Sequence, residues 1–248
     1  MFDVHAHLTD DVIYGDLDNV IKEAQTAGVK RFLIPAYSKN FWLRAKDIAE
    51  KYPFVYFAVG VHPLFIGEGD DQKLRETLVK HPKCLAIGEV GLDYVPDDSQ
   101  KPQQTAWFAQ EAAFAKKHDK PLVIHCRKAY YDLLEPLKEF GAPFLLHSCS
   151  CSREQVKPFL DLGAYISFSG TLTRMNAKKT IELARYVPKD KVLCETDSPY
   201  IGTDKVRPPF VRPAQVMEVA AAYAEATGMS LEEAENLTDK NAERFFVI

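Results

Sequence analysis

The chain begins with an alternation of apolar and polar residues over Met1–His7. A period of two predicts a strand, in which residues two apart share a face, so Asp3, His5 and His7 should point the same way. Two imidazoles at this spacing can bind one metal ion, with Asp3 orienting them from behind. The alternative is that these residues form the polar, solvent-facing side of an edge strand.

Further short apolar runs follow, and amphipathic segments with helical spacing separate them. The runs predict strands at Arg31–Pro35, Phe54–Val61, Cys84–Glu89, Leu122–His125, Phe144–His147, Ala164–Phe168 and Val192–Glu195. The amphipathic segments predict helices at Leu17–Ala27, Asn40–Lys51, Gln72–Lys80, Pro102–His118, Tyr130–Phe140, Arg153–Leu162, Lys178–Val187, Pro213–Thr227 and Leu231–Phe245. Ser230 and Glu233 form a capping-box pattern at the start of the last helix.

This order of elements predicts an α/β protein with a parallel sheet, because strands this apolar are buried on both faces. Eight strand–helix units in a chain of this length are typical of a (β/α)₈ TIM barrel, here with an extra C-terminal helix. We therefore expect one domain over residues 1–248. A doubly wound open sheet is the alternative, although no Gly-x-Gly-x-x-Gly follows the first strand, which argues against a dinucleotide site.

Composition narrows the class of protein further. The chain is 46% hydrophobic and 27% charged, as in ordinary soluble domains. It has no apolar run of the roughly 18 residues that a membrane span needs, and no signal peptide precedes the first strand, so we expect no membrane partner and a cytoplasmic location. The five cysteines are interpreted as reduced core residues. Zinc binding at Cys149-x-Cys151 is an alternative, but the spacing and a partner pair are missing.

Potential metal ligands stand at the predicted carboxyl ends of the strands. They are His5, His7, His62, Glu89, His125, His147 and Asp197. Barrels carry their sites at this face, so the set predicts a metal centre. Four of these imidazoles and the two carboxylates suit two divalent ions better than one, with Glu89 as the natural bridge. Mixed nitrogen and oxygen ligands leave zinc, magnesium and manganese open.

Several motifs carry a family resemblance. They are Asp3-Val4-His5-Ala6-His7-Leu8, Gly60-Val61-His62-Pro63, Ile87-Gly88-Glu89-Val90-Gly91-Leu92-Asp93-Tyr94, Val123-Ile124-His125-Cys126-Arg127 and Glu195-Thr196-Asp197-Ser198-Pro199-Tyr200. In order and spacing they resemble the TatD family of metal-dependent hydrolases and deoxyribonucleases, of the amidohydrolase superfamily. The resemblance implies a TIM barrel with a binuclear site. It implies one metal on His5, His7, Glu89 and Asp197, and the other on Glu89, His125 and His147.

The chain departs from the family pattern in two places. The family usually has a His-Cys-Phe-Ser-Gly-like segment after the sixth strand, where this chain has His147-Ser148-Cys149-Ser150-Cys151. Family members often carry Asn-x-Pro before the first closing helix, where this chain has Val211-Arg212-Pro213. The metal ligand His147 is kept, but both departures bear on the loops that would contact substrate.

The expected chemistry is metal-assisted hydrolysis by a metal-activated water. Asp197 is expected to act as general base or to pass a proton to the leaving group, the alternative being a ligand role alone. A net charge of −4 argues against a broad nucleic-acid surface but not against a local basic site. Arg127 and Lys128 follow His125 directly and are the best candidates for phosphate contacts. The resemblance implies substrate contacts from His62 and Asp93.

We therefore expect a deoxyribonuclease that removes nucleotides from DNA ends, with RNA as a further possible substrate and no obligate protein partner. An alternative is a binuclear amidohydrolase for a small-molecule amide, lactone or ester. Many such relatives bridge their metals with a carboxylated lysine after the fourth strand, where this chain has Glu89, which favours the nuclease. A third hypothesis is a metal-binding interaction module without turnover.

Overall fold

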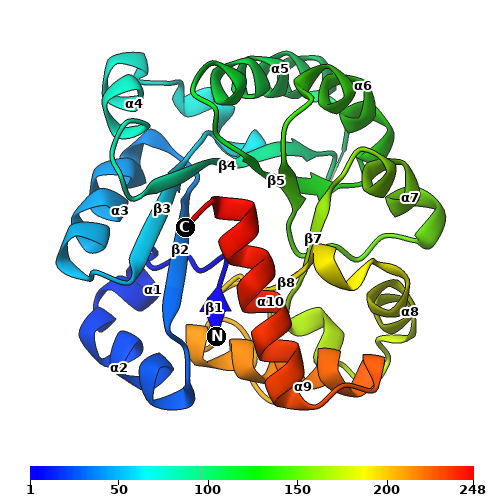
Figure 1. The fold of residues 1–248 in the computed structure, drawn as a ribbon. Coiled ribbons are helices and arrows are strands. Elements are labelled where there is room, and N and C mark those ends of the chain that lie inside the picture. The colour runs from blue at the N-terminus through cyan, green and yellow to red at the C-terminus, as the bar shows by residue number, and fades with distance from the viewer. Residues whose placement is uncertain (96) are drawn as a thin grey trace. The chain divides into compact units, whose positions relative to one another are not determined.

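The structure, a computed structural model, describes residues 1–95 and 97–248. Its strands form one eight-stranded sheet in the sequential order β1 to β8, and strands and helices alternate along the colour gradient of Figure 1. The strands are β1 Phe2–Asp3, β2 Arg31–Ala36, β3 Val55–Val59, β4 Cys84–Asp93, β5 Leu122–Arg127, β6 Phe144–Leu146, β7 Tyr165–Phe168 and β8 Val192–Cys194. The pairs β1–β2, β3–β4, β4–β5, β5–β6 and β7–β8 are parallel.

The segment after β1 also pairs with the segment after β8. A parallel bridge joins Ala6 to Ser198, the Asp197 N–H donates to the His5 carbonyl at 2.9 Å, and the His7 N–H donates to the Ser198 carbonyl at 2.9 Å. The first and last strands are therefore neighbours, as a (β/α)₈ barrel requires. This confirms the predicted barrel and excludes the doubly wound open sheet, whose strand order reverses at its centre.

Apart from a short first helix, Asp11–Tyr14, which was not predicted, the helices fall close to the predicted segments. They are α1 Asp11–Tyr14, α2 Leu17–Ala27, α3 Lys39–Lys51, α4 Gln72–Leu78, α5 Lys101–Lys117, α6 Tyr130–Phe140, α7 Arg153–Asp161, α8 Lys178–Tyr186, α9 Val216–Thr227 and α10 Leu231–Phe246. The 3₁₀ helices are η1 Pro63–Glu68, η2 Gly170–Thr173, η3 Lys189–Lys191 and η4 Pro213–Gln215. The capping box of Ser230 and Glu233 is confirmed. Among the described residues, every helix is too short or too polar to cross a membrane.

Two strands differ most from their predicted bounds. The first was expected over Met1–His7, but only Phe2–Asp3 has strand geometry, because the following residues bond in turn to the two neighbouring segments. The fourth continues past Glu89 to Asp93, because its last residues stay buried and pair with β5 as far as Arg127. Glycines interrupt the apolar run at this point, so the sequence pattern ended the strand too early.

The described chain divides into two compact units. Unit 1 comprises Met1–Ile34, Ser148–Val156 and Tyr165–Ile248, and unit 2 comprises Pro35–His147 and Lys157–Ala164. The single domain over residues 1–248 stays a prediction. In unit 1, helix α10 packs against β1 and β8, and the rings of Phe2 and Phe246 lie 5.7 Å apart. In unit 2, the buried Trp42 indole N–H donates to the carbonyls of Ala36 and Gly60, which ties α3 to β2 and to the end of β3.

Candidate metal centre

The ligand candidates fall into two clusters, one in each unit. His5, His7 and Asp197 form the unit 1 cluster. His62, Glu89, His125 and His147 form the unit 2 cluster, which Asp93 joins from one side. All seven side chains that the sequence singled out at strand ends therefore lie in a cluster, and none is left alone on the surface.

In the unit 1 cluster, two imidazole nitrogens and a carboxylate oxygen converge. His5 Nε2 lies 3.3 Å from His7 Nε2, and Asp197 Oδ1 lies 3.0 Å from His7 Nε2 and 3.8 Å from His5 Nε2. His5 is 0% exposed and His7 is 3% exposed, so the alternative of a solvent-facing edge strand is wrong. Asp197 has a left-handed backbone (φ 52°), which aspartate tolerates better than most residues. Such a conformation, held by bonds on both sides, is characteristic of functional sites.

Asp3 supports this cluster through the backbone. Its carboxylate accepts the His5 N–H at 3.3 Å, the Thr196 N–H at 3.0 Å and the Thr196 hydroxyl at 2.6 Å. These bonds connect the residues before His5 to those before Asp197, so Asp3 sets the spacing of the two ligand-bearing segments. Burial raises the pKa of Asp3 to about 8, although its hydrogen bonds with Thr196 oppose this rise. The sequence suggested this supporting role but gave no sign of its partner, Thr196.

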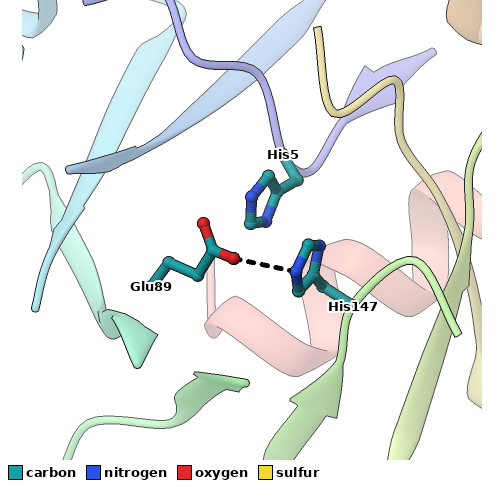
Figure 2. A group of neighbouring side chains, drawn as sticks. All are labelled: His5, Glu89 and His147. Atoms are coloured by element: carbon teal, nitrogen blue, oxygen red, sulfur yellow. Dashed lines mark ion pairs between the residues drawn. The ribbon is translucent and has the colours of Figure 1, made fainter. Parts of the chain in front are cut away.

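In the unit 2 cluster, one oxygen of Glu89 faces three imidazoles. Glu89 Oε1 lies 2.9 Å from His147 Nε2, 3.1 Å from His125 Nδ1 and 3.5 Å from His62 Nε2. Figure 2 shows the ion pair between Glu89 and His147. Gly91 allows the close approach of β4 to β5 beside this cluster, since a Cβ at this residue (φ +141°) would lie 2.0 Å from the His125 carbonyl oxygen.

His125 is held at both ring nitrogens, by Glu89 at Nδ1 and by Asp93 at Nε2, the latter at 2.9 Å. Burial opposes protonation of His125, but the hydrogen bonds to Asp93 and Glu89 outweigh it and raise the pKa of the imidazole. Burial likewise opposes ionisation of Asp93, yet its bond to His125 leaves the pKa of the carboxyl below its usual value. The hydrogen bond between the two groups therefore favours the charged form of each.

His62 differs from the other imidazoles of this cluster. Its Nδ1 accepts the Leu64 N–H at 3.2 Å, at the start of η1. A neutral imidazole has one donor and one acceptor nitrogen, so this bond places the proton on Nε2, which faces Glu89. Burial, followed by the charge of His125, lowers the pKa of His62 to about 3, which keeps the ring neutral. His62 therefore presents an N–H donor to the cluster, where a metal ligand would present a lone pair.

The sequence analysis missed Gln104, which holds Asp93. The Gln104 side chain accepts the Asp93 N–H at 2.8 Å and donates to the Asp93 carbonyl at 2.9 Å. It is 3% exposed, whereas its neighbour Gln103 is exposed. A signal was available, because glutamine on the buried face of a helix needs polar partners. Arg127 and Lys128, the predicted phosphate contacts, are exposed at the end of β5.

The donor sets suit divalent cations. Each cluster offers two imidazole nitrogens and a carboxylate oxygen, the mixed set that zinc and manganese accept. In both clusters imidazole nitrogens face each other, at 3.3 Å for His5 and His7 and at 3.4 Å for His125 and His147. When neutral tautomers present a lone pair at each of these nitrogens, one cation can be bound by both nitrogens of a pair. Cys149 and Cys151 are buried with their sulfurs 3.4 Å apart, and neither belongs to a ligand group among the described residues.

Comparison with known proteins agrees with this chemistry. A family model for TatD-related DNases matches residues 2–247. An uncharacterized metal-dependent hydrolase of Bacillus subtilis, YabD, is 36% identical over 100% of this chain and 99% of its own length. The 3'-5' ssDNA/RNA exonuclease TatD of Klebsiella pneumoniae is 31% identical, covering 100% of this chain and 98% of its own. The crystal structure of YjjV, a TatD homologue from Escherichia coli, superposes with a TM-score of 0.93 at 27% identity, covering 100% of this chain and 98% of its own.

Proposed function

The chain belongs to the TatD-related DNase family of metal-dependent hydrolases, and from this membership we propose that it is a deoxyribonuclease that hydrolyses phosphodiester bonds at DNA ends. The observation that carries the proposal is the pair of largely buried clusters at the strand ends, each with at least two imidazoles and a carboxylate. Single-stranded DNA is the proposed substrate and RNA a second one, as the name of the Klebsiella relative suggests.

We propose that the chain binds two divalent cations, one at each cluster; that these cations form one binuclear centre stays a prediction from the family resemblance. His5, His7 and Asp197 would hold one divalent cation, and Glu89, His125 and His147 the other. Glu89 as a bridge between the two cations stays a prediction from the family resemblance. When bound, such cations supply Lewis acidity at the phosphoryl oxygens.

Asp197 is proposed as the general base. Its side chain is 11% exposed, the most of the three in the unit 1 cluster, so it lies where water and substrate can reach it. A carboxylate there can accept the proton of the attacking water and return it to the leaving oxygen. If Asp197 serves only as a metal ligand, no step of the reaction should depend on proton transfer to its carboxylate.

His62, Arg127 and Lys128 are proposed to bind the phosphate. The Nε2–H of His62 provides a neutral donor beside Glu89, and a neutral donor can approach a phosphoryl oxygen without adding charge next to the cations. The exposed cations Arg127 and Lys128 would bind the neighbouring phosphate along the strand. Asp93 would act on substrate only through His125, which it holds at 2.9 Å.

The test is a cleavage assay with labelled single-stranded DNA and RNA in added magnesium, manganese or zinc. We expect release of nucleotides that His125→Ala abolishes and His81→Ala preserves. His81 is a matched control because it lies before β4, outside both clusters, and its Nδ1 accepts the Lys83 N–H. Release that persists in His125→Ala would reveal a contaminating nuclease. Turnover of small esters or amides with intact DNA would replace the proposal with the small-molecule hydrolase. The cytoplasmic location stays a prediction, which cell fractionation would test.

A further inference from the structure

Tyr200 is a partly exposed aromatic residue beside the unit 1 cluster. It follows Asp197 by three residues, and its ring centroid lies 5.0 Å from that of His7 at an interplanar angle of 71°. The residue is 48% exposed, although its neighbours Asp197 and Ser198 are buried. A large aromatic side chain therefore stands at the solvent side of a proposed metal ligand.

Both ends of Tyr200 are held. Its backbone N–H donates to the Asp197 carbonyl at 2.8 Å, and its hydroxyl donates to Asp10 Oδ2 at 2.5 Å. The ring is thus fixed between the segment after β8 and the N-cap of α1. A ring that is already ordered loses little conformational entropy when a ligand packs on it, which favours its use as a binding surface.

The chemistry of an ordered, partly exposed phenol ring fits a nucleobase. Every base has a π-face, and stacking on aromatic side chains is the usual way in which proteins bind single strands without reading their sequence. The His7 contact places this ring next to a residue proposed to hold one of the two cations. Tyr186 offers a contrast, because it is similarly exposed at 38%, but its ring packs near Arg153 at the end of α8.

We propose that Tyr200 is a substrate-binding residue that stacks on the nucleobase adjacent to the bond that is cut. The inference rests on the proposed function, since it names the part of a nucleic acid that this site recognises. Stacking would hold the terminal nucleotide equally in the ground state and in the transition state. It therefore lowers KM and leaves kcat nearly unchanged.

The experiment compares two single-stranded oligonucleotides that differ only at the terminal nucleotide, which carries either a base or an abasic tetrahydrofuran unit. We expect the wild-type holoenzyme to show a KM about tenfold lower for the base-bearing end, within the range for one stacked base. Tyr200→Ala should remove this difference. Tyr200→Phe, which keeps the ring, and Tyr186→Ala should retain it.

A merely structural role of Tyr200 predicts another result. If the ring only supports His7, Tyr200→Ala will lower kcat equally for both substrates, and this outcome overturns the inference. Equal KM values for the two ends in the wild-type enzyme overturn it as well. Thermal unfolding of Tyr200→Ala shows whether the variant is folded.

Binding separates this inference from the proposed function. Fluorescence anisotropy with the same oligonucleotides, in EDTA and with added manganese, requires no cleavage. If the wild-type protein cuts nothing but binds the base-bearing end more tightly through Tyr200, the stacking site stands and the nuclease proposal fails. If binding is equal for both ends in wild type and in Tyr200→Ala, the stacking site is absent.

Discussion

The two clusters are built in different ways from the same kinds of residue. In unit 1 both imidazoles come from one short segment, His5 and His7, and a single distant residue, Asp197, completes the set. In unit 2 the carboxylate is central, and Glu89 faces imidazoles carried by three different segments, after β3, in β5 and after β6. The two-residue spacing within one short segment brings the first pair together, whereas the second cluster depends on how several strands pair.

The supports differ as well. Asp3 and Thr196 hold the unit 1 cluster through the backbone. In unit 2, side chains are held directly, since Asp93 binds the His125 ring and Leu64 donates to His62. We therefore expect that, in unit 1, mainly substitutions of the three proposed ligands will lower activity. In unit 2, substitutions of the residues that orient the proposed ligands should lower activity as well.

The largest effect is expected from Glu89→Gln. The substitution removes the charge that one oxygen presents to three imidazoles while keeping the shape of the side chain. Loss of several kcal/mol of charge stabilisation corresponds to a decrease of about a thousandfold in kcat/KM. Steady-state kinetics on labelled DNA, together with the metal content of the purified variant, would measure this. Activity within tenfold of wild type would contradict a central role for Glu89.

Asp197→Asn is expected to have the next largest effect, about a hundredfold in kcat, the lower end for loss of a general base. The pH dependence of kcat distinguishes the two roles of this residue. A base role predicts that the variant loses the acidic limb of the profile, because no carboxylate remains to be ionised there. Retention of that limb with a weaker metal affinity would assign Asp197 to metal binding alone.

Each cluster that binds a metal ion should add its own increment to the free energy of unfolding. At a free manganese concentration of about one hundred times Kd, each site adds about 2.7 kcal/mol to the free energy of unfolding. We expect His7→Ala and His147→Ala each to lose about one such increment, as measured by urea unfolding in manganese and in EDTA. Loss of the whole stabilisation in either variant would mean that the clusters do not bind independently.

The smallest effect is expected from Gln104→Ala. This residue orients Asp93 through two backbone bonds, and loss of an orienting partner typically costs about tenfold or more in activity. Gln103→Ala is the matched control, because its side chain is exposed on the same helix. Equal activities of the two variants would show that Asp93 keeps its position without Gln104.

Much of this protein could be predicted from local sequence patterns. The alternation of apolar runs with amphipathic segments predicted the barrel, because parallel strands that are buried on both faces stay apolar throughout. Helix α6 has its predicted bounds, Tyr130–Phe140, because apolar spacing and a following glycine define it locally. The end of β4 was wrong because pairing with β5, and not the run of apolar residues, decides where that strand stops.

The sequence by itself determined which residue types stand at the strand ends, and the two-residue spacing of His5 and His7 was enough to predict a shared ligand role. Only the tertiary structure decided how each of these groups is held. The Leu64 N–H determines which ring nitrogen of His62 carries the proton. Gln104 holds Asp93, and Asp10 holds the Tyr200 ring. The physical reason is that tautomer, orientation and pKa depend on the atoms within hydrogen-bonding distance, and most of those atoms come from other segments of the chain.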